Sequence, residues 1–143
     1  MAAQHGGAGP VGIVGLGNMG GRITRRMVDA GHPVWGVDRV AARIPASGAK
    51  PAPSLAELAA ACDVIMLSLP DSSVIESVIR GPGGLLERAR DGQVIVDLST
   101  ANPTSTRSLH DQLAARGNRV VDALGDLAGG VRVAGQTAGE KED

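Results

Sequence analysis

Val11-Gly-Ile-Val-Gly-Leu-Gly-Asn-Met-Gly20 is the stretch of this 143-residue sequence that decides its fold. Its first four residues form a short apolar run typical of a buried strand, and glycines at positions 15, 17 and 20 follow at once. Apolar side chains then recur at helical spacing at Met19, Ile23, Met27 and Ala30. The stretch therefore predicts a strand that turns through a glycine loop, residues 15–20, directly into a helix.

Apolar runs and helix signals alternate along the rest of the chain. Further strands are expected over 34–37, 63–68, 93–97 and 119–122. Helices are expected over 54–61 and 72–80, where Ser54/Glu57 and Ser73/Glu76 have the spacing of capping boxes. A third should begin at Asn102-Pro103, run to residue 116 and stop at Gly117.

The strands are unalternating Val, Ile and Leu runs separated by helices, which is the pattern of strands buried on both faces. The sequence thus predicts an α/β fold, doubly wound, with a mostly parallel sheet and helices on both faces. One domain is expected over residues 10–123. Residues 1–9 are interpreted as a disordered lead-in and residues 124–143 as an irregular tail, because both are Gly-rich and lack periodicity. Lys50 is assigned to a Pro/Ala-rich loop.

Charge and composition exclude several classes of partner. Fourteen basic and fifteen acidic residues give a net charge of −1, and aromatic residues make up 1 %, which disfavours nucleic acid and anionic membranes. A lone Cys62 excludes an intrachain disulfide and a cysteine-based zinc site, and is interpreted as a small buried hydrophobe. The apolar run 64–69 is too short to span a bilayer, and the first residues lack a signal-peptide pattern. We expect a cytoplasmic protein whose partners are small molecules or proteins.

The glycine loop has the spacing GxGxxG, which gains weight from its place between a strand and a helix. Gly15 would permit the tight turn, Gly17 the close approach of a pyrophosphate, and Gly20 the packing of helix on strand. The amides around Asn18 and Met19 would then face the phosphates with the positive end of the helix dipole. The alternative is that these glycines are purely geometric.

A carboxylate is the second requirement of a dinucleotide site, and Asp38 stands 18 residues after Gly20, directly after a predicted strand. Its charge favours NAD, because it would repel a 2′-phosphate, whereas the adjacent Arg39 could pair with that phosphate. NAD is favoured over NADP on the carboxylate argument. Asp38 could also be a plain turn residue.

Other polar residues are weaker candidates. Ser99 and Thr100 end a strand on the edge where such sheets bind ligands. His32 and His110 have no nucleophile or second ligand at meaningful spacing, so both are interpreted as surface histidines. Asp97, which ends a strand, is expected to cap a loop or to face solvent.

The sequence resembles the β-hydroxyacid dehydrogenases, the family of 3-hydroxyisobutyrate dehydrogenase, tartronate semialdehyde reductase and 6-phosphogluconate dehydrogenase. The resemblance rests on 11–20, Gly-His-Pro-Val (31–34), Leu-Pro (69–70) with Gly-Pro-Gly-Gly-Leu-Leu (81–86), and Val-Asp-Leu-Ser-Thr-Ala-Asn-Pro (96–103). It implies an N-terminal Rossmann domain that binds NAD or NADP. The cofactor-binding residues it implies, together with those inferred above, are Gly15, Leu16, Gly17, Asn18, Met19, Gly20, Asp38, Arg39, Leu69, Pro70, Val74 and Thr100.

The sequence departs from the family after residue 123. The family's Pro-Val-Ser-Gly-Gly is replaced by Leu124-Gly-Asp-Leu-Ala-Gly-Gly130, and neither Lys50 nor Lys141 resembles its catalytic lysine. The family's C-terminal helical domain is expected to be absent, so this chain should bind cofactor with little turnover. The complete enzyme would transfer hydride between nicotinamide and a small 3-hydroxy acid. The missing domain should leave an apolar face uncovered and so allow self-association. The alternative is a non-enzymatic dinucleotide sensor or interaction module, which a stable monomer would favour.

Overall fold

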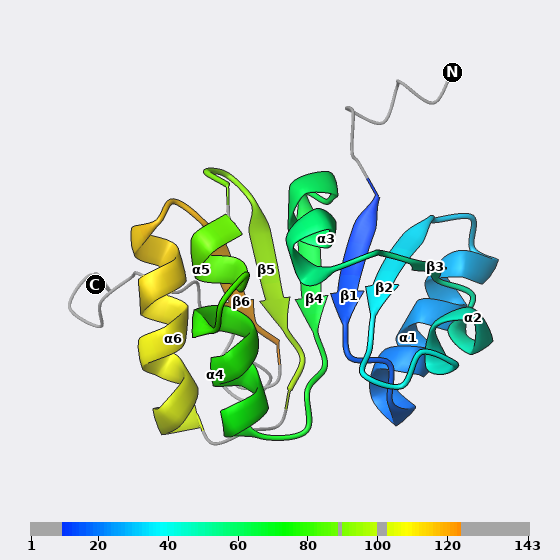
Figure 1. Cartoon of the computed structure of the whole chain (residues 1–143), viewed down its shortest axis with the longest axis horizontal. Coiled ribbons are helices and arrows are strands. Elements are labelled where there is room, and N and C mark those ends of the chain that lie inside the picture. Colours follow the sequence, from blue (N-terminus) through cyan, green and yellow to red (C-terminus); the bar gives the residue numbers. More distant parts are fainter. Residues whose placement is uncertain (1–9, 89, 100–102, 124–143) are drawn as a thin grey trace, which may run out of the picture.

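Parallel strands form one sheet in the order β3-β2-β1-β4-β5-β6 (Figure 1). The structure is a computed structural model, and it describes residues 10–88, 90–99 and 103–123. The interpretations of residues 1–9, Asn102 and residues 124–143 lie outside this part of the chain. The strands are β1 (Val11–Val14), β2 (Val34–Val37), β3 (Lys50–Pro51), β4 (Val64–Leu67), β5 (Val94–Asp97) and β6 (Arg119–Asp122).

The sheet reverses its winding direction at β1. The chain adds β2 and β3 on one side of β1, then crosses back to place β4, β5 and β6 on the other. In register, Val11 of β1 lies between Val34 of β2 and Val64 of β4. The carboxyl ends of β1 and β4 are therefore neighbours, and in such sheets this switch point is where ligands bind.

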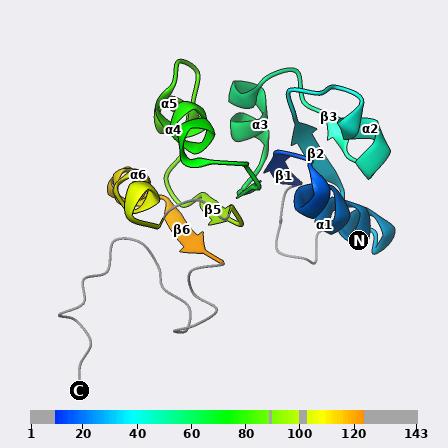
Figure 2. The ribbon, with the colours of Figure 1, turned by 90° about the horizontal axis from the view of Figure 1, so that it is seen from below.

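Helices cover both faces of the sheet, which confirms the predicted doubly wound α/β class (Figure 2). The helices α1 and α2 pack on one face through a cluster that includes Ile13, Leu16 and Ile44. The helices α3 to α6 pack on the other face through a larger cluster that includes Leu58, Ile75 and Leu113. The bounds are α1 (Asn18–Asp29), α2 (Arg43–Ser47), α3 (Leu55–Ala61), α4 (Ser72–Arg80), α5 (Leu85–Arg88) and α6 (Pro103–Ala115).

Helix starts follow local chemistry, with one correction. Ser54 caps α3 as predicted, its hydroxyl accepting the Glu57 N–H at 3.1 Å. The predicted Ser73/Glu76 box of α4 is wrong, because Asp71 is the cap and accepts the Val74 N–H at 3.0 Å. Two acceptors thus compete within three residues, and the carboxylate, which comes two residues earlier in the chain, takes the helix start.

Short elements were missed by the sequence analysis. The helices α2 and α5 have five and four residues, too few for a periodicity to be seen. Lys50 lies in β3 rather than in a loop, and β3 exists only because it pairs with β2, Lys50 opposite Trp35. These elements are set by tertiary contacts, which no short stretch of sequence encodes.

Candidate functional site

The glycine loop joins β1 to α1 at the switch point, and its glycines have separate roles. Gly15 has φ 100°, and a Cβ there would collide with the Ser68 carbonyl of the neighbouring strand's exit. A Cβ on Gly20 would collide with the carbonyl of Gly15, so the helix can approach the loop only without a side chain. At Gly17 a Cβ meets nothing within 4 Å. The fold therefore requires Gly15 and Gly20 but not Gly17.

The first turn of α1 begins at Gly17, beside the open space where a Cβ would meet nothing. Gly17 is the N-cap and supplies no side-chain hydrogen bond, and Asn18 and Met19 are exposed. The first amides of a helix have no partner within it, and they carry the positive end of its dipole. This end of α1 can therefore bind an anionic group.

Asp38 follows β2 and is tied to the glycine loop. Its Oδ2 accepts the Leu16 N–H at 2.6 Å and its Oδ1 the Val40 N–H at 2.7 Å. The Arg43 guanidinium of α2 lies 3.7 Å from Oδ1. The side chain of Asp38 is 6 % exposed, against 53 % for Arg43. Asp38 thus holds the turn through two backbone amides. Since a carboxylate offers about four acceptor positions, it can also accept hydrogen bonds from a ligand.

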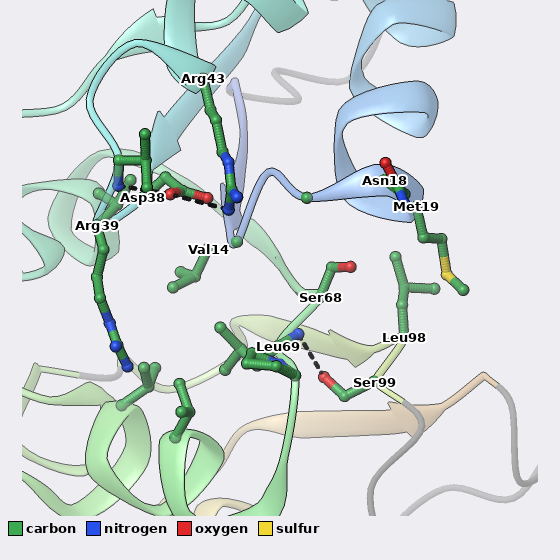
Figure 3. A pocket seen from close by; sticks show the side chains of 17 residues that line it. Val14, Asn18, Met19, Asp38, Arg39, Arg43, Ser68, Leu69, Leu98 and Ser99 are labelled. Atoms are coloured by element: carbon green, nitrogen blue, oxygen red, sulfur yellow. Dashed lines mark hydrogen bonds and ion pairs between the residues drawn. The ribbon is translucent and has the colours of Figure 1, made fainter.

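The opposite wall comes from the exits of β4 and β5. Ser68, Leu69 and Pro70 follow β4, while Leu98 and Ser99 follow β5. The two exits are joined by a hydrogen bond from the Leu69 N–H to the Ser99 Oγ at 2.9 Å (Figure 3). Side chains from α4, among them Val74, complete an apolar floor.

Together these walls enclose a pocket of about 530 Å³, in the size range of small-molecule and cofactor sites. Figure 3 shows Asp38, Arg39 and Arg43 at one end and Leu98 and Ser99 at the other. The lining of the described part carries one carboxylate and two guanidinium groups at one end, and elsewhere it is mostly apolar, with Asn18, Ser68 and Ser99 as its uncharged polar side chains. The residues that line it are Val14, Gly15, Gly17, Asn18, Met19, Val37, Asp38, Arg39, Val40, Arg43, Ser68, Leu69, Pro70, Val74, Val78, Leu98 and Ser99.

Most of the predicted site residues meet in this pocket, with three exceptions. The side chain of Leu16 is buried in the core beneath α1 and only its amide faces Asp38. Gly20 lies in the helix–strand contact. Thr100 is outside the described residues. Sequence reasoning missed Ser68, which directly precedes the Leu-Pro motif, and Arg43, which stands on a helix too short to predict.

The expectation that His110 is a surface histidine is wrong. His110 lies on the inner side of α6, where its Nε2 is 2.7 Å from Oδ2 of Asp97. Their side chains are 7 % and 3 % exposed. The other Asp97 oxygen accepts the Ser99 N–H at 2.8 Å, so Asp97 caps a loop as expected but does not face solvent. A helix face can bury one histidine if the neighbouring layer offers an acceptor.

Two classes of site receive no support from the residues that the structure describes. No group of three His, Cys, Asp or Glu side chains could hold a metal ion there. No helix of that part is long and apolar enough to cross a membrane. Cys62 is buried, as expected, and burial with the nearby Asp63 charge raises its pKa to about 11.

Known proteins match both the sequence and the fold. The family model of the NAD binding domain of 6-phosphogluconate dehydrogenase matches residues 10–138. The chain is 35 % identical over 125 residues to 2-(hydroxymethyl)glutarate dehydrogenase of Eubacterium barkeri, covering 85 % of this chain and 41 % of that protein. The solved 3-hydroxyisobutyrate dehydrogenase of Mycobacterium tuberculosis with L-serine has a TM-score of 0.69 at 27 % identity, covering 88 % and 45 %.

A reductive aminase from Aspergillus terreus, solved with NADPH and ethyl levulinate, has a TM-score of 0.66 at 27 % identity, covering 80 % of this chain and 40 % of the enzyme. The chain thus spans less than half the length of each of these relatives. On the match of the family model, this chain belongs to the β-hydroxyacid dehydrogenase family, and its residues 10–138 match the NAD-binding domain of that family.

Proposed function

We propose that the pocket binds a nicotinamide dinucleotide with its pyrophosphate against the first turn of α1. The observation that carries this proposal is the open space at Gly17. A glycine whose Cβ would meet nothing within 4 Å is not needed by the fold, yet it lines the pocket at the start of α1, where no side chain of the N-cap binds the first amides. A backbone without side chain at that point allows close approach of a pyrophosphate.

The adenosine ribose would lie at Asp38, and the preferred cofactor would be NAD. Asp38 keeps acceptor positions free after binding two amides, so it can accept hydrogen bonds from ribose hydroxyls. A 2′-phosphate would meet the negative charge of this carboxylate. Arg39 and Arg43 reduce that repulsion, since both line the pocket and Arg43 is near Asp38. We therefore expect a modest preference for NAD rather than exclusion of NADP.

The reaction of the complete protein would be hydride transfer between the nicotinamide and a small 3-hydroxy acid, as the names of its relatives suggest. The chain's own part is to bind and orient the cofactor. Hydride transfer to or from a hydroxy acid also needs a group that handles the hydroxyl proton. No lysine or histidine is among the described residues that line the pocket. Residues 1–143 alone should therefore bind cofactor without appreciable turnover.

Titration of the purified chain with NAD and NADP tests these statements. Binding stabilises the folded state, by about 2.7 kcal/mol when the ligand is at 100 times its Kd, so melting temperature should rise. Trp35 on β2 is the only tryptophan, so energy transfer to bound NADH gives an independent readout. Absence of any response to both dinucleotides would overturn the proposed binding. A tighter Kd for NADP would overturn the preference, and hydroxy-acid turnover by this chain would overturn the last expectation.

A further inference from the structure

A chain of buried hydrogen bonds runs from α6 to the pocket wall. His110 contacts Asp97 at 2.7 Å, Asp97 accepts the Ser99 N–H at 2.8 Å, and the Ser99 Oγ accepts the Leu69 N–H at 2.9 Å. Leu69 and Ser99 line the pocket, whereas His110 and Asp97 do not. This series of hydrogen bonds therefore joins α6, which lies outside the pocket, to the end of the pocket that Leu69 and Ser99 line.

Because Asp97 is buried, it depends on both of its hydrogen-bond donors. A carboxylate that is 3 % exposed needs hydrogen-bond donors on both oxygens, because water cannot supply them. One oxygen of Asp97 has the Ser99 amide and the other has His110. Without the His110 donor, the buried carboxylate would rotate or draw water to itself. Either change displaces the loop whose amide it holds.

That loop decides how the exits of β4 and β5 lie against each other. The two strands end side by side, with Leu67 opposite Asp97 in the register. Beyond this pair the ladder continues from the Leu98 N–H to the Leu67 carbonyl at 2.8 Å. The next link is the Ser99 side chain, which replaces a backbone acceptor for Leu69. The pocket wall after β4 is thus held by the Ser99 hydroxyl, which also donates to the Leu67 carbonyl at 3.4 Å, while Asp97 holds the backbone amide of Ser99.

We propose that His110 is a positioning residue for the dinucleotide pocket, acting through Asp97 and Ser99 on Leu69. This inference rests on the proposed function of the pocket. The effect is local to one end, because Asp38 lies at the other end of the pocket (Figure 3), where it accepts the Leu16 N–H of the glycine loop and lies 3.7 Å from the Arg43 guanidinium of α2. Loss of the His110 donor should weaken a ligand that spans the pocket and spare one that occupies only the Asp38 end.

The test compares His110→Ala, His110→Gln and wild type for binding of NAD and of ADP. A glutamine amide can donate to Asp97 in place of the imidazole. We expect His110→Ala to raise the Kd of NAD about tenfold, the equivalent of 1.4 kcal/mol, with the Kd of ADP unchanged within about twofold. His110→Gln should restore most of the NAD affinity. His32→Ala, at an exposed histidine, is the matched control and should bind both ligands as wild type does.

A readout without ligand separates this inference from the proposed function. Amide hydrogen exchange at Leu69 should accelerate in His110→Ala and not in His32→Ala, whether or not any dinucleotide binds. If wild type fails to bind NAD while this exchange accelerates, the proposed function fails and the positioning stands. The positioning role of His110 would be overturned by equal loss of NAD and ADP affinity in His110→Ala, by failure of His110→Gln to restore NAD affinity, or by unchanged exchange at Leu69. If His110→Ala does not fold, Ser99→Ala is used instead with Leu69 exchange as its readout, because Ser99 itself lines the pocket. Unchanged Leu69 exchange in that variant would overturn the inference.

Discussion

Replacing Gly17 by alanine separates the needs of the fold from the needs of the ligand. The residue is the N-cap of α1 with φ −74° and ψ −155°, a conformation open to alanine, and the added Cβ would meet nothing within 4 Å. Gly17 nevertheless lines the pocket. The new methyl group would therefore occupy space that is empty in the protein alone and that the proposed pyrophosphate needs.

The two contributions to stability nearly cancel. Alanine is a poorer N-cap than glycine by about 0.5–1 kcal/mol, while losing a glycine from the unfolded chain stabilises by about 0.4–1 kcal/mol. The free energy of unfolding without ligand should change by less than about 1 kcal/mol, or about 4 °C in Tm. For the bound state, each charge-assisted hydrogen bond lost between an amide and a phosphate costs about 1.5–3 kcal/mol. The Kd should rise at least about tenfold.

Thermal unfolding with and without NAD measures both quantities. At a NAD concentration of 100 times the wild-type Kd, wild type should gain about 2.7 kcal/mol and the variant no more than about 1.4 kcal/mol. Gly15→Ala is the contrasting control and should lose stability without ligand, because φ 100° and the Ser68 carbonyl both oppose a side chain. A Gly17→Ala protein with the full NAD shift would refute the reasoning, as would one destabilised as much as Gly15→Ala.

Further expectations concern Asp38, Asp71 and Cys62. Asp38→Asn should lower the NAD-over-NADP ratio of affinities about tenfold and destabilise by about 1–2 kcal/mol, because one backbone amide loses its acceptor; parallel titrations would show neither change if the carboxylate is incidental. The hydrogen bonds from the Ser73 hydroxyl and the Val74 amide lower the pKa of Asp71, so its contribution is present above the unfolded pKa and is lost as pH falls through the lowered folded pKa. Asp71→Ala should therefore lower Tm at neutral pH and lose that effect in acid; an equal deficit at both pH values would contradict it. Cys62, fully buried and with its pKa raised to about 11, should react with a thiol reagent at pH 8 only as fast as the domain opens, and labelling at the rate of a free thiol would show that Cys62 is not protected.

Local sequence determined the elements that carry strong periodicity and the loop that links the first two. The strand, glycine turn and helix over residues 11–29 could be predicted because each signal is confined to a few neighbouring residues. The place of Asp38 beside the loop followed as well. A parallel strand on each side of a connecting helix brings both carboxyl ends to one edge, so spacing alone put the carboxylate near the glycines.

Tertiary structure alone decided how distant segments meet. His110 is buried because α6 happens to present it to the end of β5, a relation between layers that no local pattern encodes. Arg43 reaches the pocket from a five-residue helix, and Lys50 joins the sheet only through pairing with β2. Periodicity reports which face of an element is apolar, but not which neighbour covers it. The contacts of Arg43 with Asp38 and of His110 with Asp97 join separate elements, so they cannot be predicted from a local stretch of sequence.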